Sequence, residues 1–129
     1  MVGIVIVSHS NKVAEGVKEL ALQMAKEVPI AAAGGTSDNE LGTDLEKIIS
    51  AIKQVYTQDG VAVLFDLGSA CMNAQMAIES LTDEMQSNVK VLDVALVEGA
   101  ITIAVDSSIG KSLSQIEEAV KKLCLHKMA

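Results

Sequence analysis

Residues 2–7 read VGIVIV and residues 61–65 read VAVLF, and neither stretch carries a polar side chain. This pattern is typical of parallel strands that helices cover on both faces, because such strands have no side that meets water. Two further runs of strand type occupy Val28–Ala33 and Val89–Val94. The four runs together predict the strands of one buried sheet.

Apolar residues at helical spacing fill the intervals between the predicted strands. They cover residues 13–24, 45–56 and 70–85, and a last helix is expected after Gly110. The segment Gly99–Val105 fits either a helix or a fifth strand. The apolar stripe of the last helix would consist of Ile116, Val120, Leu123 and Cys124.

Short polar residues mark the starts of two of these helices. Thr43 and Glu46 have the spacing of a capping box in front of the second helix. Ser69 stands where its hydroxyl could accept a hydrogen bond from an unpaired backbone N–H at the start of the third helix.

Strands and helices alternate along the chain, and one or two helices follow the last strand. Such alternation indicates a parallel sheet, and right-handed crossovers place helices on both of its faces. The sequence therefore predicts an α/β fold: a three-layer, doubly wound sheet of the flavodoxin-like type with strand order 2-1-3-4. No linker, repeat or low-complexity stretch divides the chain, so residues 1–129 are expected to form a single domain.

The composition argues against several classes of function. Ten lysines, no arginine and seventeen acidic residues give a net charge of −7, which is the wrong sign for a protein that binds nucleic acid. One Tyr, one Phe and no Trp leave almost no platform for stacking bases or a flavin. The apolar runs are far shorter than the ~20 residues that span a bilayer. No basic segment of a signal peptide precedes residue 2. We expect a cytoplasmic protein without membrane or nucleic-acid contacts.

Two cysteines, Cys71 and Cys124, lie far apart in helix-like sequence and form no metal-binding or disulfide pattern. They are expected to be small, buried side chains in a reducing compartment.

Polar and glycine residues gather after the predicted strands. In a doubly wound sheet, ligands bind beyond the carboxyl ends of the strands, at the point where the strand order reverses. Here that point lies between the first and third strands, so residues 8–10 (SHS) should face residues 66–69 (DLGS). Residues 34–43 and the pair Glu98-Gly99 flank them.

His9 is the candidate reactive residue, and Asp66 is the candidate group that orients it. A carboxylate that accepts a hydrogen bond from one ring nitrogen fixes the tautomer and leaves the other nitrogen as a nucleophile. The alternatives are a structural histidine and an aspartate that only forms a turn before Gly68. His126 lies in a tail that is expected to fray, and no function is expected of it.

Several chemistries do not fit this pair. A metal site would need further ligands beyond Asp66 and Glu98, and the nucleophile elbow of serine hydrolases is absent. Phosphoryl transfer through His9 fits better, because the protein then has only to position the group and stabilise its oxygens. Without arginine, the available donors are the residues at two helix starts together with Lys12. The candidate phosphate-binding residues are Ser8, Ser10, Gly68 and Ser69.

Four motifs, in order at four consecutive strand ends, resemble those of a known family. They are V-S-H-S at 7–10, A-G-G-T at 33–36 with a later L-G-T, F-D-L-G-S-A at 65–70 and L-V-E-G-A at 96–100. They resemble the DhaM family, the phosphotransferase subunits of phosphoenolpyruvate-dependent dihydroxyacetone kinases, which is related to the mannose-type EIIA domains of the sugar phosphotransferase system. Mannose-type domains typically carry Thr before the histidine, Gly after it and Gly-Gly-Ser-Pro after the aspartate. Ser8, Ser10 and residues 68–70 follow the DhaM pattern instead.

The resemblance implies an enzyme component that acts through phosphohistidine. His9 would accept a phosphoryl group from phospho-HPr and pass it to ADP held on the subunit DhaL, and the resulting ATP would phosphorylate dihydroxyacetone bound to the subunit DhaK. Asp66 matches the aspartate that pairs with the active histidine. No cofactor is expected on this chain, since ADP, ATP and Mg²⁺ would belong to DhaL. The resemblance also implies a homodimer.

Two other functions stay open. One is a mannose- or fructose-type sugar EIIA that passes phosphate to an EIIB partner, and the other is a non-catalytic, flavodoxin-like regulatory module. If His9 carries phosphate between two proteins, Asn11, Lys12, Met72 and Asn73 are expected to form a docking rim around it. The helical spacing of Met72 and Met76 nevertheless favours the core for these two side chains.

Overall fold

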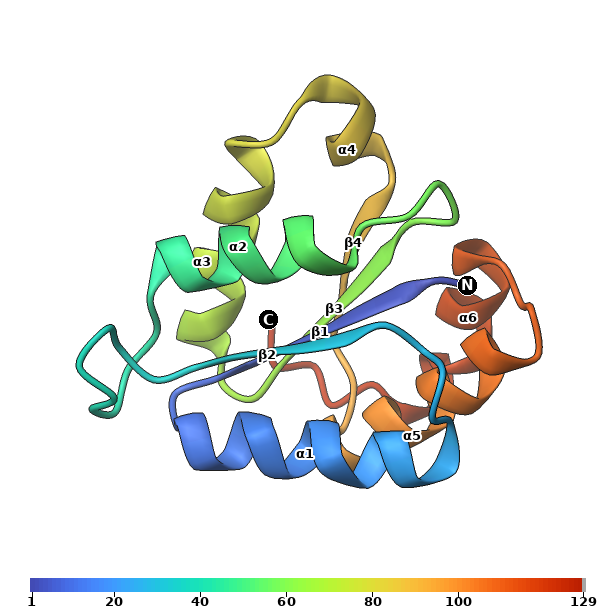
Figure 1. Ribbon diagram of the computed structural model, residues 1–129, viewed down its shortest axis with the longest axis horizontal. Coiled ribbons are helices and arrows are strands. Elements are labelled where there is room, and N and C mark those ends of the chain that lie inside the picture. Colours follow the sequence, from blue (N-terminus) through green and yellow to red (C-terminus); the bar gives the residue numbers. More distant parts are fainter. Residues whose placement is uncertain (129) are drawn as a thin grey trace.

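Four parallel strands form one sheet in the computed structural model, which describes residues 1–128. Their order is β2-β1-β3-β4, as predicted, and Figure 1 shows β1 and β3 at the centre. The strands are β1 (Gly3–Ser8), β2 (Ile30–Gly34), β3 (Val61–Phe65) and β4 (Val89–Leu92). The register places Val7 beside Phe65 and Ser8 beside Gly34. The first three strands therefore end at one edge of the sheet.

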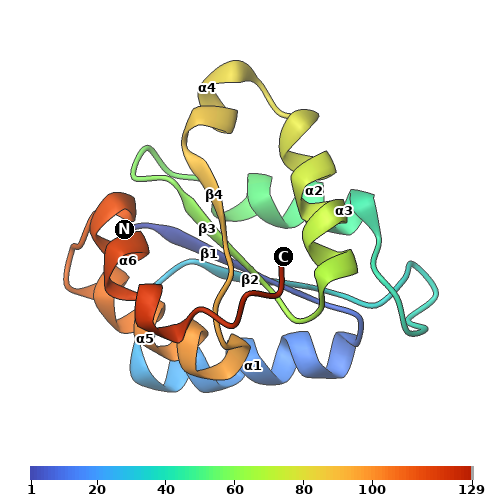
Figure 2. The same cartoon turned by 180° about the vertical axis from the view of Figure 1, so that it is seen from behind.

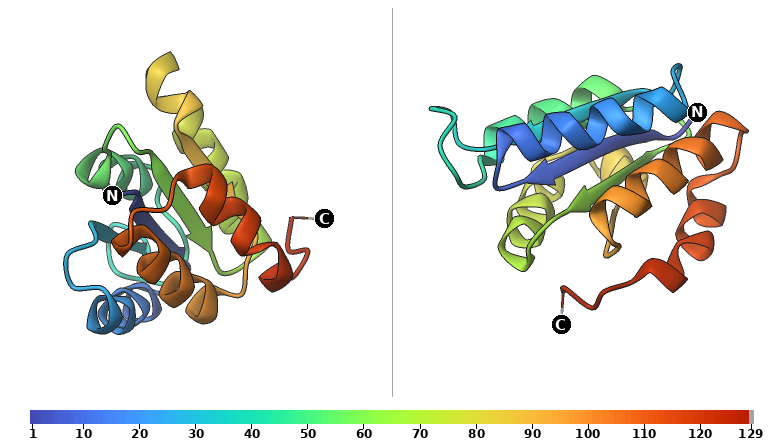
Figure 3. Two further views of the ribbon diagram at one scale, coloured as in Figure 1. Left: turned by 90° about the vertical axis from the view of Figure 1, so that its right-hand side faces the viewer. Right: turned by 90° about the horizontal axis from the view of Figure 1, so that it is seen from below.

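Helices cover both faces of the sheet, which gives the three predicted layers (Figure 3). They are α1 (Asn11–Met24), α2 (Leu45–Val55), α3 (Gly68–Glu79), α4 (Asp83–Ser87), α5 (Leu96–Ser108) and α6 (Leu113–Ala119), followed by a short 3-10 turn, η1 (Lys121–Leu123). In β1, Ile4 and Ile6 pack toward α1 and α5, whereas Val5 and Val7 pack toward α2 and α3. This alternation explains why the central strands have no polar position.

The ambiguous segment Gly99–Val105 is helical and lies inside α5. Its apolar character is explained by packing, because Ile103 and Ala104 are buried against the sheet. The predicted helix over residues 70–85 is instead two helices, α3 and α4. They separate because the Thr82 hydroxyl accepts a hydrogen bond from the Met85 amide and starts a new helix there.

Three local expectations were wrong. Asp44, not Thr43, caps α2, because its carboxylate accepts hydrogen bonds from the amides of Glu46 and Lys47. Leu67 occupies the cap position of α3, so Ser69 lies inside the first turn of that helix. The last helix ends at Ala119, and Cys124 is partly exposed beyond it, while Cys71 is buried as expected.

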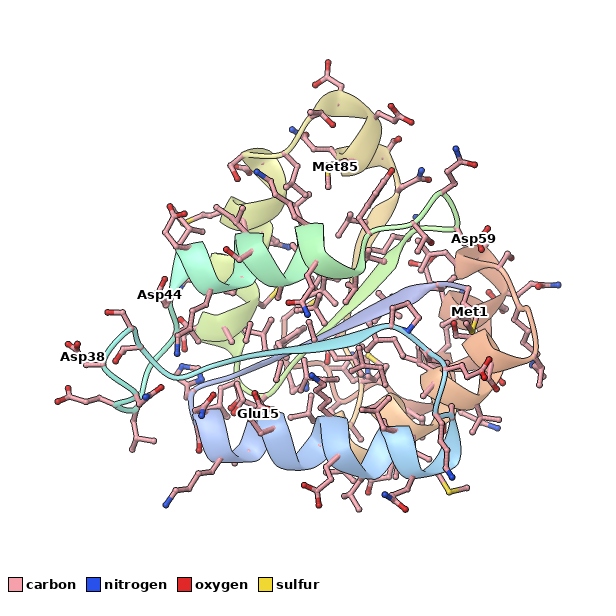
Figure 4. The ribbon with its side chains drawn as sticks, in the orientation of Figure 1. Met1, Glu15, Asp38, Asp44, Asp59 and Met85 are labelled. Carbon is pink, nitrogen blue, oxygen red and sulfur yellow. The ribbon has the colours of Figure 1, made fainter. Side chains whose placement is uncertain are left out.

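Labelled residues in Figure 4 mark the two opposite ends of the sheet. Asp38 and Asp44 lie near the carboxyl ends of the strands, and Met1 and Asp59 lie at the opposite end, where the terminal ammonium donates to the Asp59 carboxylate at 2.7 Å. Among residues 1–128, no helix combines the length and the apolar character needed to cross a membrane.

Candidate active site

The site lies where β1 and β3 end. The Asp66 amide donates to the carbonyl of Val7 at 3.2 Å, so the parallel pairing continues for one residue beyond β3. This pairing places Asp66 beside His9, the second residue after Val7. Strand geometry alone therefore brings the predicted histidine and aspartate together.

Four donors surround the Asp66 carboxylate. His9 Nδ1 lies 3.0 Å from Oδ1, and the His9 amide donates to Oδ2 at 3.0 Å. The Ser8 hydroxyl donates to Oδ2 at 2.8 Å, and the Leu67 amide donates to Oδ1 at 2.7 Å. Burial raises the pKa of Asp66, but the hydrogen bonds from His9, Ser8 and Leu67 outweigh it and hold the pKa below its usual range. The carboxylate is therefore ionised at neutral pH.

The second ring nitrogen of His9 faces α3. Its Nε2 lies 2.7 Å from the hydroxyl of Ser69. An ionised carboxylate can only accept hydrogen bonds, so Nδ1 carries a proton, and in the neutral ring Nε2 then holds the lone pair. The His9 side chain is 26% exposed, and the Asp66 side chain is 22% exposed. The ring thus presents one basic nitrogen at the surface, and the hydrogen bond from Nδ1 to Asp66 orients it.

Ser8 and Ser10 stabilise the turn that carries His9. Ser8 is fully buried, and its hydroxyl accepts a hydrogen bond from the Ser10 amide at 3.1 Å while it donates to Asp66. The Ser10 hydroxyl caps α1 by accepting from the Val13 amide. Both hydroxyls therefore have a partner within the chain, that of Ser8 in the interior and that of Ser10 at a partly exposed position.

Gly68 and Ser69 begin α3 at the exposed side of His9. No side chain caps this helix, and both residues are exposed. The first amides of a helix have no intrahelical acceptor, and the positive end of the helix dipole lies there. An anion beside His9 Nε2 would meet this end of α3 directly.

The loop between β2 and α2 closes the other side of the site. The Gly42 amide donates to the His9 carbonyl at 2.8 Å, and the Gly35 amide donates to the Ser8 carbonyl at 3.2 Å. Gly42 has φ 138°, a conformation that favours glycine. Gly42 lies beside the site, as predicted. Nothing in the sequence, however, indicates the hydrogen bond between its amide and the His9 carbonyl. An unpredicted hydrogen bond from Asn73 to Thr43 joins this loop to α3.

The remaining candidates lie at the rim or away from it. Lys12 is exposed and, with Asn11, lines a groove of about 650 Å³ beside Ser10. Glu98 is exposed in the first turn of α5. His126 is exposed beside Cys124, with 3.9 Å between Nδ1 and Sγ. In the part of the chain that the structure describes, no three His, Cys, Asp or Glu side chains form a group that could hold a metal ion.

Met72 and Met76 are exposed to 66% and 52%, so the expectation that they belong to the core was wrong. The reason is that α3 packs on the sheet through a stripe of small side chains, which turns the opposite face outward. The stripe consists of Ala70, Cys71, Ala74 and Ala77. Met72 is therefore exposed, as the predicted docking rim requires.

The C-terminal segment was expected to fray, but it packs against the sheet. The Lys127 ammonium donates to the carbonyls of Phe65 and Val94, and the Met128 amide donates to Asp93. Sequence reasoning missed this segment because it has no motif of its own.

A family of known proteins matches most of the chain. The EIIA-man family, described as the PTS system fructose IIA component, matches residues 3–117. This range contains β1 to β4, His9 and Asp66.

Several curated relatives are described as DhaM subunits of dihydroxyacetone kinases. The chain is 36% identical to the PTS-dependent dihydroxyacetone kinase phosphotransferase subunit DhaM of Lactococcus lactis, over 97% of this chain and 98% of that protein. It is 38% identical to the phosphoryl donor subunit DhaM of dihydroxyacetone kinase 2 of Listeria innocua, over 90% and 94%. The DhaM of Escherichia coli is 40% identical over 90% of this chain, but the match spans only 25% of that longer protein.

Solved structures share the fold. The crystal structure of the unknown function protein EF1359 superposes with a TM-score of 0.84 at 35% identity, covering 94% of this chain and 93% of the other. A sigma-54 interaction domain protein from Enterococcus faecalis superposes with a TM-score of 0.71 at 19% identity, covering 94% and 88%, and supports the fold alone.

Proposed function

Because this chain belongs to the EIIA-man family, and within it to the DhaM subunits, we propose that it is the phosphoryl donor subunit of a phosphoenolpyruvate-dependent dihydroxyacetone kinase and that His9 carries the phosphoryl group. The observation that carries the assignment to His9 is its hydrogen-bonded pair with Asp66, which leaves Nε2 basic and accessible. The proposal thus joins a family relationship to one geometric feature.

In the proposed first step, Nε2 attacks the phosphorus of the phosphohistidine on HPr. The new bond from Nε2 to phosphorus forms as the bond to the HPr nitrogen breaks, and Asp66 stabilises the positive charge on the ring. The Ser69 hydroxyl, now 2.7 Å from Nε2, would turn to donate to a phosphoryl oxygen. The uncapped start of α3, at Gly68, would meet the remaining charge.

In the proposed second step, a terminal phosphate oxygen of ADP on DhaL attacks the phosphorus. The bond to Nε2 breaks, His9 returns to its neutral form, and ATP is formed on DhaL for transfer to dihydroxyacetone on DhaK. The nucleotide and Mg²⁺ would be held by DhaL, so this chain needs no cofactor of its own. The partners of the phosphotransferase system would place the reaction in the cytoplasm.

The decisive experiment is incubation with phosphoenolpyruvate, enzyme I and HPr, followed by intact-protein mass spectrometry. We expect one added phosphoryl group that is labile in acid and stable in alkali. His9→Ala should abolish it, and the matched variant His126→Ala should retain it. Absence of the adduct from the unmodified protein would contradict the proposal and leave the regulatory-module reading.

A second candidate function is that of a sugar EIIA, since the matched family is described as a fructose IIA component. Chasing the phosphorylated protein separates the two functions. Loss of the phosphoryl group to DhaL with bound ADP supports the kinase subunit. Loss to an EIIB protein, with none to DhaL, would support the sugar transporter instead.

A further inference from the structure

We propose that Lys127 is a positioning residue for phosphoryl transfer, because it holds the turn from Phe65 to Gly68, which carries Asp66 and leads into Ser69. This inference rests on the proposed phosphorylation of His9. Figure 2 shows the C-terminal segment running past β4 toward α3, which is the path that brings Lys127 to this turn.

The side chain of Lys127 holds the first residue of the turn. Its ammonium donates to the carbonyl of Phe65 and, at 2.7 Å, to the carbonyl of Val94. The same nitrogen lies 4.5 Å from the centre of the Phe65 ring. One cation thus ties the end of β3 to the chain that follows β4, at the residue directly before Asp66.

The backbone of Lys127 passes close to the last residue of the turn. A Cβ placed on Gly68 would lie 3.1 Å from the Lys127 carbonyl oxygen, so the two segments are in close contact. The next residue, Met128, donates its amide to Asp93 Oδ2 at 2.9 Å. Lys127 therefore lies against the turn both before and after Asp66, at Phe65 and at Gly68.

The partners that Lys127 contacts suit a charged ammonium. The groups that the ammonium contacts, two carbonyls and a ring face, are acceptors only. Asp93 Oδ1 is buried with no hydrogen-bond partner among residues 1–128, and the carboxylate is near enough to stabilise the cation. Burial lowers the pKa of Lys127, and the nearby Asp93, Asp66, Cys71 and Cys124 offset this lowering only in part.

This charge acts on the reacting groups and not on docking. A nearby cation favours the ionised form of a carboxylate, and Asp66 is one of the charges that raise the pKa of Lys127, although hydrogen bonds from His9, Ser8 and Leu67 are what lower the pKa of Asp66. In a chain without arginine, Lys127 is also a positive charge close to the phosphoryl site. Removing it should slow the transfer step within the complex and leave the affinity for the partner protein unchanged.

The test compares Lys127→Met with Lys122→Met, which removes an exposed lysine of the same segment. The rate of transfer from phospho-HPr to His9 is measured as a function of phospho-HPr concentration. We expect Lys127→Met to lower the maximal rate between about tenfold and a hundredfold, the range for a lost positioning group, with KM unchanged. Lys127→Arg, which keeps the charge, should recover part of the loss, and Lys122→Met should match the unmodified protein.

A pH profile separates this role from a structural one. Without the cation, Asp66 should become protonated at higher pH, so the acid limb of the maximal rate should move upward in Lys127→Met. The limb should stay in place in Lys122→Met. Asp93 and the thiols of Cys71 and Cys124 are unchanged in both variants, so their titration cannot cause a difference between the two pH profiles.

The outcomes are distinct. If the unmodified protein takes no phosphoryl group, the proposed function fails. If it does, and Lys127→Met has the same maximal rate and acid limb, the present inference is overturned while the function stands. Should Lys127→Met melt below the assay temperature, Asp93→Asn replaces it. This variant keeps Lys127 but removes the negative charge that stabilises its ammonium. A reduced maximal rate with unchanged KM supports the inference there, and an unchanged rate overturns it.

Discussion

His9 receives its orientation from one carboxylate and its exposure from the end of a strand. Asp66 accepts a hydrogen bond from His9 Nδ1 and another from the His9 amide, so ring and backbone are fixed by the same side chain. Since β1 and β3 are neighbours in the sheet, this pair forms without contributions from distant loops. Contacts of single residues therefore orient the proposed nucleophile and set the tautomer of its ring.

Asp66→Asn should keep the fold and slow transfer from phospho-HPr by about a hundredfold or more, because the amide cannot stabilise the charged ring. The matched control Asp59→Asn, at the opposite end of the sheet (Figure 4), should leave the rate unchanged. Stopped-flow or quenched measurements of phosphohistidine formation check both. An equal rate in Asp66→Asn would refute the orienting role.

Stability should also depend on pH through Asp66. Its pKa is lowered in the folded protein, so the carboxylate stabilises the fold above its ordinary pKa of about 4. This stabilisation is lost as the pH falls through the lowered pKa of the folded state. Urea midpoints measured from neutral to acid pH should fall more steeply for the unmodified protein than for Asp66→Asn. Parallel curves would contradict the lowered pKa.

At the scale of elements, close approach between α1 and β2 fixes the turn that carries His9. A Cβ on Gly34 would lie 2.6 Å from the Ser10 carbonyl oxygen and 2.7 Å from the Asn11 Cα. Both are backbone atoms, so they cannot move without shifting the start of α1. By contrast, an added Cβ on Gly16 in the same helix would meet nothing within 4 Å beyond its chain neighbours and the nearby backbone of the helix itself.

These two glycines make a matched pair. Gly34→Ala should destabilise the protein by about 1–3 kcal/mol, the usual effect of overpacking, and should slow phosphorylation of His9. Gly16→Ala should stabilise it by about 0.5–1 kcal/mol, because alanine is the better helix former. Denaturant unfolding measures both changes. Equal effects at the two positions would show that α1 and β2 are not in contact as described.

Strand order and helix order were predictable because each depends on short runs of sequence. The outward face of α3 was not, since methionine and alanine at helical spacing fit either orientation. The sheet decided it, because only the small residues such as Ala70 and Ala74 allow α3 to lie close. The same holds for Asp44, which caps α2 in place of the predicted Thr43.

At the scale of the whole molecule, charge is the main constraint. The chain has a net charge of −7 and no arginine, yet it is proposed to hold a dianionic phosphoryl group. Helix starts and one partly buried lysine would have to supply the positive potential. Because so few positive groups are available, loss of Lys127 should have a measurable effect on the rate of phosphoryl transfer.

The homodimer that the resemblance implies stays a prediction. Sedimentation at micromolar concentration should give about twice the 13.5 kDa of the chain. The apolar segment of α5 does not argue for it, since Ile103 and Ala104 are buried in the core of the single chain. A mass of one chain at every concentration would remove the prediction without affecting the proposed chemistry.

The sequence by itself determined the sheet, its strand order and the meeting of His9 with Asp66. The apolar runs and the turns after them are local features of the sequence. Parallel pairing of β1 with β3 then places His9 and Asp66 side by side at one end of the sheet. Only the tertiary structure decided that Ser69 faces Nε2, that Gly42 holds the His9 carbonyl and that Lys127 contacts the turn around Asp66. Each of these contacts joins segments far apart in the chain, and no short pattern in either segment records its partner.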